Sequence, residues 1–486
     1  MARASARNDP ASRVFGSKHL NEKGTGLGLL GILLSLGLLM YLAYRGITVL
    51  VLAPLLALLA TLFAGQGRLL ATYTEVFMPA LGNYLLTFFP LFLLGAIFGK
   101  LMADSGSART IAEWFTDKIG GSQAIAAVVL SCGVLTYGGV SLFVVAFAVY
   151  PIANALFHRS STPKRLIPAA LALGSFTFTM TAFPGTPAIQ NAIPAPYFGT
   201  TPFAAPVLGT IAGLIMMVGG ILWLNMRRAR AEARGEGYGD HERTDADAEP
   251  PASGLPGMAV AVLPVVAVIS INALCTYVVF PAFDYSYLGT DEYGDTTIDD
   301  VRGIWSIIVA MVAAIVLCIA LNLKRLEHLM ESVNKGTMGS LLPVFNTASE
   351  VGYGAVIASL PAFAVVRDAV LGVSSNPLVS VAVATNVLAG ITGSASGGMS
   401  IALETLGERF REMAEQSDIS LELMHRVTAL ASGGLDALPH NGAVITLLAI
   451  TGLTHKQSYS DIFVVAVAIP LLATVAVIAL GSVIVL

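Results

Sequence analysis

Three ionisable side chains lie deep inside apolar stretches of this 486-residue sequence: Glu350, Asp436 and His440. Ionisable groups are costly inside a hydrocarbon phase, and where they occur they commonly carry ions or protons. A desolvated carboxyl group and a histidine both exchange protons near neutral pH. These residues are therefore our candidates for proton coupling. Asp436 could equally be a hydrogen-bonding group that fixes the local backbone.

The composition places these residues in a membrane protein. Hydrophobic residues make up 55% of the chain, charged residues 12%, and the mean hydropathy is +0.75, whereas soluble domains are about 25% charged. Apolar runs of membrane-spanning length recur throughout. They predict an all-α polytopic protein with twelve membrane segments: 26–44, 46–65, 81–103, 122–157, 165–198, 205–226, 257–281, 303–322, 336–371, 376–404, 424–453 and 461–486.

Several classes of function are disfavoured by what the sequence lacks. No cluster of Lys and Arg suggests a nucleic-acid partner, and all three cysteines lie in apolar segments, where we expect neither a disulfide nor a metal site. No convergent set of nucleophile, base or metal ligands suggests an enzyme or a cofactor. The lipid bilayer and a small transported solute are the expected partners.

The two halves of the chain resemble each other. Three short matches recur in the same order: 138–141 with 397–400 and 95–97 with 354–356, both at an offset of 259, and 182–184 with 437–439 at an offset of 255. The order predicts a duplication, with a first repeat over 26–226 and a second over 257–486. The remaining parts are an N-terminal tail, 1–25, and a polar linker, 227–256.

Segment 122–157 is too long for one crossing and too short for two, because about 36 residues of helix cover ~54 Å against a core of ~30 Å. With Gly138 and Gly139 near its middle, it is expected to form a re-entrant hairpin, and segment 376–404 is its partner. Each repeat then crosses five times, so the second is inverted relative to the first. The distribution of Lys and Arg favours a cytoplasmic position for the linker.

A polar binding site at mid-membrane requires a segment of non-helical backbone. Such a segment is stable in a membrane protein only where it lines a cavity inside the protein. Four places qualify: the hairpin tips and the Pro-Gly breaks inside the broken helices 165–198 and 424–453. The half-helix after each break should offer open N–H groups to an anion, so that a carboxylate could bind without an arginine. The candidate substrate-binding residues are Gly139, Ser141, Thr181, Gly185, Thr186, Asn346, Thr347, Ser394, Ser396, Ser400, His440 and Asn441.

With these motifs in view, the sequence resembles the gluconate permease (GntP) family of the ion transporter superfamily. The resemblance rests on five stretches, 138–143, 177–187, 346–350, 393–398 and 433–442, and favours the branch of D-3-hydroxybutyrate permeases. It implies proton-coupled uptake of a small hydroxy monocarboxylate across a bacterial inner membrane. It also implies a scaffold and a mobile transport domain that works as an elevator, in a homodimer.

Alternatives remain open at this point. Gluconate or another sugar acid could be the substrate, although Phe143, Phe176, Phe178 and Phe183 beside the motifs favour a smaller, more apolar acid. Hydroxyl and amide groups at the tips and breaks could bind sodium, which would then be the coupling ion in place of the proton. A passive channel is not excluded by the repeat alone.

Overall fold

The structure is a computed structural model that describes residues 22–65, 67–119, 123–239 and 254–483. Residues 1–21 of the predicted tail and 240–253 of the predicted linker therefore lie outside the described residues, and the last four residues of the predicted tail belong to α1. Within the first half of the chain the helices are α1 Glu22–Tyr44, α2 Val49–Phe63, α3 Leu69–Thr72, α4 Met78–Asp104, α5 Ser107–Ile119, α6 Ala124–Tyr137, α7 Leu142–Arg159, α8 Ile167–Phe176, α9 Ile189–Ala192, α10 Pro194–Phe198 and α11 Pro206–Glu232.

The second half is also helical. Its helices are α12 Met258–Leu274, α13 Phe280–Ala282, α14 Ile298–Asn322, α15 Leu329–Ser359, α16 Phe363–Leu371, α17 Pro377–Thr392, α18 Ala395–Gln416, α19 Leu421–Ser432, α20 Gly442–Thr451, α21 His455–Phe463 and α22 Ile469–Val483. Single π-helical turns join several of them, at Tyr73–Phe77, Phe178–Ala182, Cys275–Val279 and Val464–Ala468. Short 3₁₀ turns lie at Lys164–Leu166, Ser286–Gly289, Asp291–Tyr293 and Leu435–Ala437.

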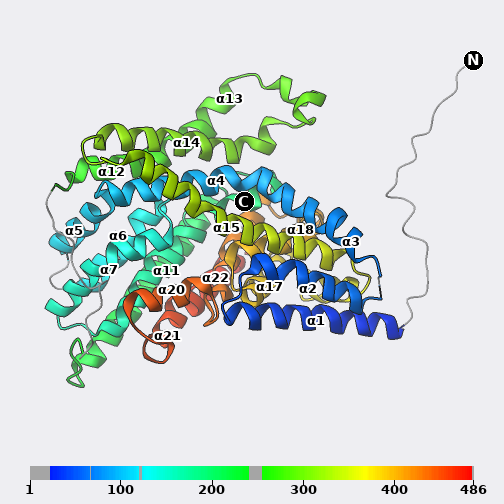
Figure 1. The fold of residues 1–486 in the computed structure, drawn as a ribbon, viewed down its shortest axis with the longest axis horizontal. Coiled ribbons are helices and arrows are strands. Elements are labelled where there is room, and N and C mark those ends of the chain that lie inside the picture. The colour runs from blue at the N-terminus through cyan, green and yellow to red at the C-terminus, as the bar shows by residue number, and fades with distance from the viewer. Residues whose placement is uncertain (1–21, 66, 120–122, 240–253, 484–486) are drawn as a thin grey trace, which may run out of the picture.

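Six helices form a series across the molecule. α12 packs on α14, α14 on α4, α4 on α15, α15 on α2 and α2 on α1. Figure 1 shows α12 and α14 along one edge and α1 and α2 towards the opposite one, with α4 and α15 between them. α4 and α15 approach closely because a Cβ atom on Gly336 would lie 2.8 Å from the Cα atom of Ile97. Small residues allow such contacts between membrane helices.

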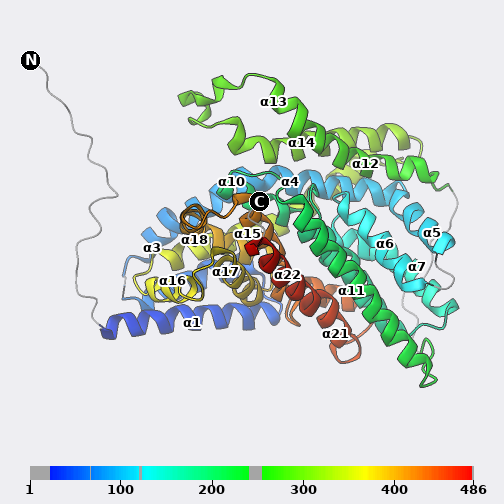
Figure 2. The ribbon, with the colours of Figure 1, turned by 180° about the vertical axis from the view of Figure 1, so that it is seen from behind.

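The remaining helices form a bundle beside this series. α6 packs on α8, α11 on α22, and α19 on both α17 and α22. Figure 2 shows α11 and α22 running across the molecule when it is seen from behind. Two antiparallel hairpins belong to this bundle. α6 and α7 meet at the Gly138–Gly139 turn, and α17 and α18 meet at Gly393–Ser394.

The chain forms an all-helical, multi-pass membrane protein. Six of the described helical stretches are long and apolar enough to cross a bilayer, and a seventh results if α15 and α16, bent by 99°, form one span. This is fewer than the twelve predicted segments. Five others are shorter apolar helices, among them α6, α17 and α20, because Gly, Pro and polar residues end these helices before they reach spanning length.

Several helix boundaries differ from the predicted segment boundaries, among them two helix ends. α18 continues to Gln416, twelve residues beyond the predicted end at 404, and α11 continues to Glu232 inside the predicted linker. Hydropathy falls at both places, but Glu, Arg, Met and Ala are strong helix formers. A helix therefore continues where the apolar run has stopped.

A buried ion network joins three of these elements. Asp461 on α21, whose side chain is 1% exposed, accepts from Arg227 Nε at 2.7 Å and from Arg165 Nη1 at 3.1 Å. Trp223 Nε1 donates to the same carboxylate at 3.2 Å. Arg165 also holds Glu236 through two bonds, and this guanidinium lowers the pKa of Glu236. Because its pKa is lowered by folding, Glu236 adds stability above its unfolded pKa and loses it as the pH falls.

We expect Asp461→Asn to destabilise the protein by ~3–5 kcal/mol, because two arginines would lose their common anion in a buried place. Thermal unfolding of the detergent-purified protein measures the effect. Asp368→Asn is the matched control, since Asp368 and its partner Arg367 are 67% and 47% exposed and such pairs contribute ~0–1 kcal/mol. Equal shifts for both variants would contradict the assigned role of the network.

Candidate functional site

The tip of the second hairpin is built by a glycine followed by a serine. Gly393 ends α17 in the left-handed region at φ +66°, which glycine adopts without strain. Ser394 is extended and caps α18, its hydroxyl accepting from the N–H of Gly397 at 3.0 Å. The two arms touch through backbone, since a Cβ atom on Gly398 would lie 2.1 Å from the nitrogen of Ala389. The tip is therefore a rigid turn.

Glu350 lies directly against this tip. It is a buried residue of α15, and a Cβ atom on Gly397 would lie 1.4 Å from its Oε2 atom, so that a side chain at position 397 would displace the carboxyl group. The same Cβ position lies 3.0 Å from the hydroxyl oxygen of Ser394, so this hydroxyl is close to the carboxyl group. Oε2 has no hydrogen-bond partner among the described residues, and the same holds for the buried hydroxyls of Tyr84 and Ser400. Three helices, α4, α15 and α18, thus each carry a buried polar atom that is unpaired among the described residues.

The second break meets the same tip. Asn441 caps α20 by accepting from the N–H groups of Ala443 and Val444 at 2.6 and 3.0 Å. Its amide nitrogen donates to the carbonyl oxygen of Gly393 at 2.8 Å. The ring of His440 packs on Gly393, and its Nε2 is buried without a partner among the described residues. His440 and Asn441 therefore join the Glu350 cluster.

Asp436 lies apart from His440. The spacing i, i+4 would bring the two together on a helix, but the chain here forms the 3₁₀ turn Leu435–Ala437 and is then extended at Leu438. The described structure contains no hydrogen bond or ion pair between them. Asp436 is buried beside Tyr459 of α21, whose hydroxyl donates to the carbonyl oxygen of Ala437 at 3.1 Å. The two candidate proton carriers are separate sites.

The first tip and the first break also contact each other. Gly139 has φ +92°, and a Cβ atom on it would lie 2.8 Å from Cγ of Pro187. The hydroxyl of Tyr137 donates to the carbonyl oxygen of Pro184 at 2.7 Å. Ser141 caps α7 without a side-chain bond and lies beside Gly99 of α4. In each half, then, a hairpin tip lies against the break of a discontinuous helix.

The N–H groups at both breaks are less open than the sequence suggests. Gly185 donates its N–H to the carbonyl oxygen of Pro202, and Ala188 donates to the hydroxyl of Thr186. After the second break, the side chain of Asn441 occupies the first donors of α20. The chain supplies its own acceptors, because a Thr or Asn before a helix caps it. In this conformation an anion would have to displace them.

Three other predicted residues have protein partners. Asn346 accepts from the hydroxyl of Thr48 and the N–H of Leu50 at 3.0 and 3.2 Å, and so joins α15 to the start of α2. Thr181 bonds to its own helix. Thr347 also bonds back, to Pro343, but its hydroxyl lies 3.4 Å from that of Ser396 at the second tip. Of the three, only Thr347 lies in the Glu350 cluster.

Sequence reasoning missed the most deeply buried cation, Arg426 of α19. Its guanidinium makes five hydrogen bonds, with bond partners contributed by residues 181–204 around the first break. Four go to the carbonyl oxygens of Thr181, Pro202 and Ala204, and one to the side chain of Asn191. An arginine at this depth inside an apolar segment was itself a signal, since such residues are rare.

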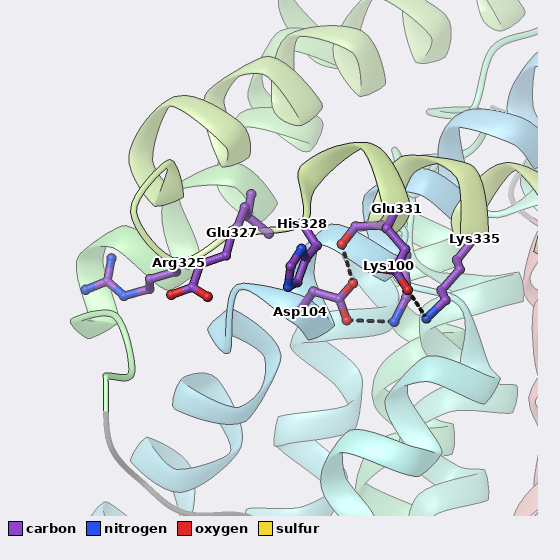
Figure 3. Close-up of a pocket in the computed structure, with 9 residues that line it drawn as sticks. Lys100, Asp104, Arg325, Glu327, His328, Glu331 and Lys335 are labelled. Atoms are coloured by element: carbon purple, nitrogen blue, oxygen red, sulfur yellow. Dashed lines mark hydrogen bonds and ion pairs between the residues drawn. The ribbon is translucent and has the colours of Figure 1, made fainter.

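A cavity of about 310 Å³ lies at the far end of α15. Figure 3 shows its charged lining, in which Lys100 pairs with Asp104, and Lys335 with Glu331. Ser332 donates to Asp104 at 2.6 Å and so connects α15 to α4. Ser332 precedes Glu350 by 18 residues, roughly 27 Å along the helix. This pocket is therefore separate from the Glu350 cluster.

We expect Arg426→Lys to destabilise the protein although it keeps the charge. One ammonium cannot reach acceptors spread around the first break, and each buried carbonyl left without a donor costs ~1–3 kcal/mol. Thermal unfolding and the size-exclusion profile report the loss. Arg411→Lys, at an exposed pair with Glu415, should change stability by no more than ~0.5 kcal/mol. A wild-type melting temperature for Arg426→Lys would contradict this role.

Known proteins share this architecture. The chain aligns over 95% of its length with the crystal structure of the YdaH transporter of Alcanivorax borkumensis, covering 98% of that chain at a TM-score of 0.52 and 17% identity. It also aligns with MtrF of Neisseria gonorrhoeae, described as one of a class of antimetabolite efflux pumps, at a TM-score of 0.50 and 10% identity, over 85% of this chain and 84% of that one. These similarities concern the fold.

Sequence comparison identifies the family. The chain is 45% identical over 464 residues to the "Uncharacterized transporter YxjC" of Bacillus subtilis (strain 168), covering 93% of this chain and 97% of that protein. A transporter of Haemophilus influenzae is 35% identical over 79 residues, 16% of this chain and 19% of that protein. The family model described as "GntP family permease" matches residues 27–484. The chain is thus a transporter and not an enzyme, and it belongs to the GntP family of permeases.

Proposed function

We propose that this transporter is a secondary carrier that takes up a small hydroxy monocarboxylate together with protons, with D-3-hydroxybutyrate as the leading substrate. The observation that carries the proposal is the meeting of the second hairpin tip, the second helix break and the buried carboxyl of Glu350. Asn441 joins the first two through the carbonyl of Gly393 at 2.8 Å, and Glu350 lies on Gly397. Such a junction suits a substrate and a coupling ion that move together.

The carboxylate of the substrate would be bound by neutral donors. At the second tip the hydroxyl of Ser396 lies 3.4 Å from that of Thr347 and 3.5 Å from that of Ser394, and His440 adds a ring nitrogen that is unpaired among the described residues. Arg426 has its donors directed to the first break. In this proposal it fixes the backbone around the site and does not contact the substrate.

Aromatic rings near the first break favour a short substrate. Phe183 packs edge-to-face on Phe178 and on Tyr137, with ring centroids 5.4 and 5.9 Å apart. A polyhydroxylated acid such as gluconate needs a hydroxyl or amide partner for each of its hydroxyl groups, since an unpaired buried polar group is costly. Gluconate or another sugar acid is the alternative substrate.

Alternating access would follow from relative movement of the two groups of helices. We assign α1, α2, α4, α12, α14 and α15 to a scaffold, and the hairpins with the discontinuous helices to a transport domain. The two parts would derive from the inverted repeats 26–226 and 257–486 and would work as an elevator in a homodimer in the bacterial inner membrane. α4 lies at the boundary, because it contacts Ser141 near the first tip through Gly99.

Uptake into proteoliposomes tests the function. With purified protein and labelled D-3-hydroxybutyrate, we expect saturable accumulation under an inward proton gradient that a protonophore abolishes, with inhibition by short hydroxy acids. If accumulation requires sodium, the coupling ion is sodium and not the proton. If only gluconate is taken up, the substrate is gluconate and not D-3-hydroxybutyrate. Equilibration without accumulation would indicate a channel and overturn the carrier.

The variant Asp436→Asn tests coupling at the second break. It removes the only titratable group of the turn Leu435–Ala437, so we expect accumulation to be lost while folding remains intact. Uptake at matched protein density is the measurement, and the elution profile is the control for folding. Asp295→Asn, in the exposed loop, should transport normally. Full accumulation by correctly inserted Asp436→Asn would refute a role for Asp436 in coupling.

A further inference from the structure

We propose that Asn272 of α12 is a positioning residue of the carrier, which holds the first break against the scaffold in this conformation and releases it when the transport domain moves. The inference rests on the scaffold and transport domain proposed above, and it names a contact that this movement must break. It starts from one hydrogen bond, in which the amide nitrogen of Asn272 donates to the carbonyl oxygen of Gly185 at 3.0 Å.

Asn272 is a fully buried polar residue inside an apolar helix. Asparagine in a membrane helix commonly bonds to another helix, since the lipid offers it no partner. The carbonyl oxygen of Gly185 can only accept, so the side chain must direct its Nδ2 atom towards it. One turn later, the hydroxyl of Thr276 bonds to the Oδ1 atom of Asn272 at 3.5 Å. Nitrogen and oxygen of the amide both have partners, which fixes its orientation.

The carbonyl group of Gly185 is available because the chain is not helical at this residue. Gly185 has φ +81° and follows Pro184. Its N–H donates to the carbonyl oxygen of Pro202 at 2.9 Å, in the part of the chain that we assign to the transport domain. Gly185 is therefore bound on its N–H side by the transport domain and on its carbonyl side by the scaffold.

The other carbonyl groups bound by side chains around the first break have partners within the transport domain. The donors are the side chains of Tyr137, Asn191 and Arg426, and the acceptors are the carbonyl oxygens of Thr181, Pro184, Thr186, Pro202 and Ala204. These bonds can stay intact when the domain moves. Among the described residues, Asn272 is the one side chain of α12 or α14 that hydrogen-bonds to residues 178–205.

The same face of α12 meets the first hairpin tip through apolar contacts. Val265 precedes Asn272 by seven residues, about two helical turns, and so lies on the same face. A Cβ atom on Gly138 would lie 2.5 Å from Cγ1 of Val265, and one on Gly139 would lie 3.4 Å from the sulfur of Met311 on α14. Apolar contacts have no fixed direction and can be exchanged as two surfaces slide. A hydrogen bond depends on its angle and must break.

A disulfide between the first tip and α12 tests the movement. The Cβ positions of Gly138 and Val265 are 3.1 Å apart, near the ~3.8 Å of a disulfide, and Gly138 has φ −77°, which cysteine can adopt. We expect oxidation of Gly138→Cys/Val265→Cys to reduce proton-driven uptake in proteoliposomes at least tenfold, and a reductant to restore it. Val265→Cys alone is the control for reaction with the native cysteines.

The rate at which this disulfide forms then tests Asn272. Asn272→Leu, made in the double-cysteine protein, keeps a similar volume and removes the amide. We expect oxidation by copper phenanthroline to form the disulfide at least threefold more slowly, because less of the protein remains in the conformation that Asn272 stabilises. Asn322→Leu is the matched control and should not change the rate. Asn322 is also fully buried, but on α14, where its amide donates to the carbonyl oxygen of Cys318 in its own helix.

An unchanged rate in Asn272→Leu would overturn the role of Asn272, even with a lower melting temperature, because packing alone stabilises the fold without favouring one conformation. If the leucine variant does not fold, Asn272→Ser carries the same expectation, since a serine hydroxyl bonds back to its own helix. Unreduced uptake by the fully cross-linked protein would instead refute the proposed movement of scaffold and transport domain, and this inference with it. The two failures are thus distinguishable.

Discussion

A chain that breaks its helices inside a bilayer must supply hydrogen-bond partners for the freed backbone from its own side chains. Arg426 and Asn441 do this for the two breaks. The first gathers the carbonyl groups around the first break, and the second caps α20 and holds the second hairpin tip. Both ties join segments distant in sequence. The breaks thus persist because side chains from elsewhere in the chain stabilise them, and the candidate site inherits its geometry from these bonds.

The sequence predicted which parts of the chain are unusual better than it predicted what they contact. Proline and glycine located both breaks and both tips, since these residues have local backbone effects. Arg426 was missed because its acceptors lie 222 to 245 residues earlier, and no local pattern reports such a distance. The separation of Asp436 from His440 could not be foreseen, because the chain between them is not helical but is extended at Leu438. The predicted segment ends at 404, before the end of α18, because hydropathy reports which residues prefer the membrane. It does not report where the helix ends.

Both halves of the chain contain a hairpin tip and a helix break, but the polar groups around them differ. In the first, the break is held by a guanidinium and the tip packs on proline, and the buried hydroxyl of Thr136 beside the tip is unpaired among the described residues. In the second, Glu350, Ser400 and His440 keep unpaired buried atoms within the described structure. Unsatisfied polar atoms in a native interior call for a reason beyond stability. Because the unpaired groups around the second tip include a carboxyl group and an imidazole, the proposed function places the proton chemistry there.

α18 has a consequence for how this protein can be observed. The helix is continuous from Ala395 at the buried tip to Gln416 at the surface, about 33 Å of uninterrupted rod. Its outer turns carry Arg409 and Glu412, which are exposed and pair only with each other in the described structure. A rigid rod transmits the displacement of one end to the other. Spin labels or fluorophores on the outer turns would thus report the position of the buried tip without disturbing it, and their distances to α14 would measure the displacement of the tip in the proposed elevator movement.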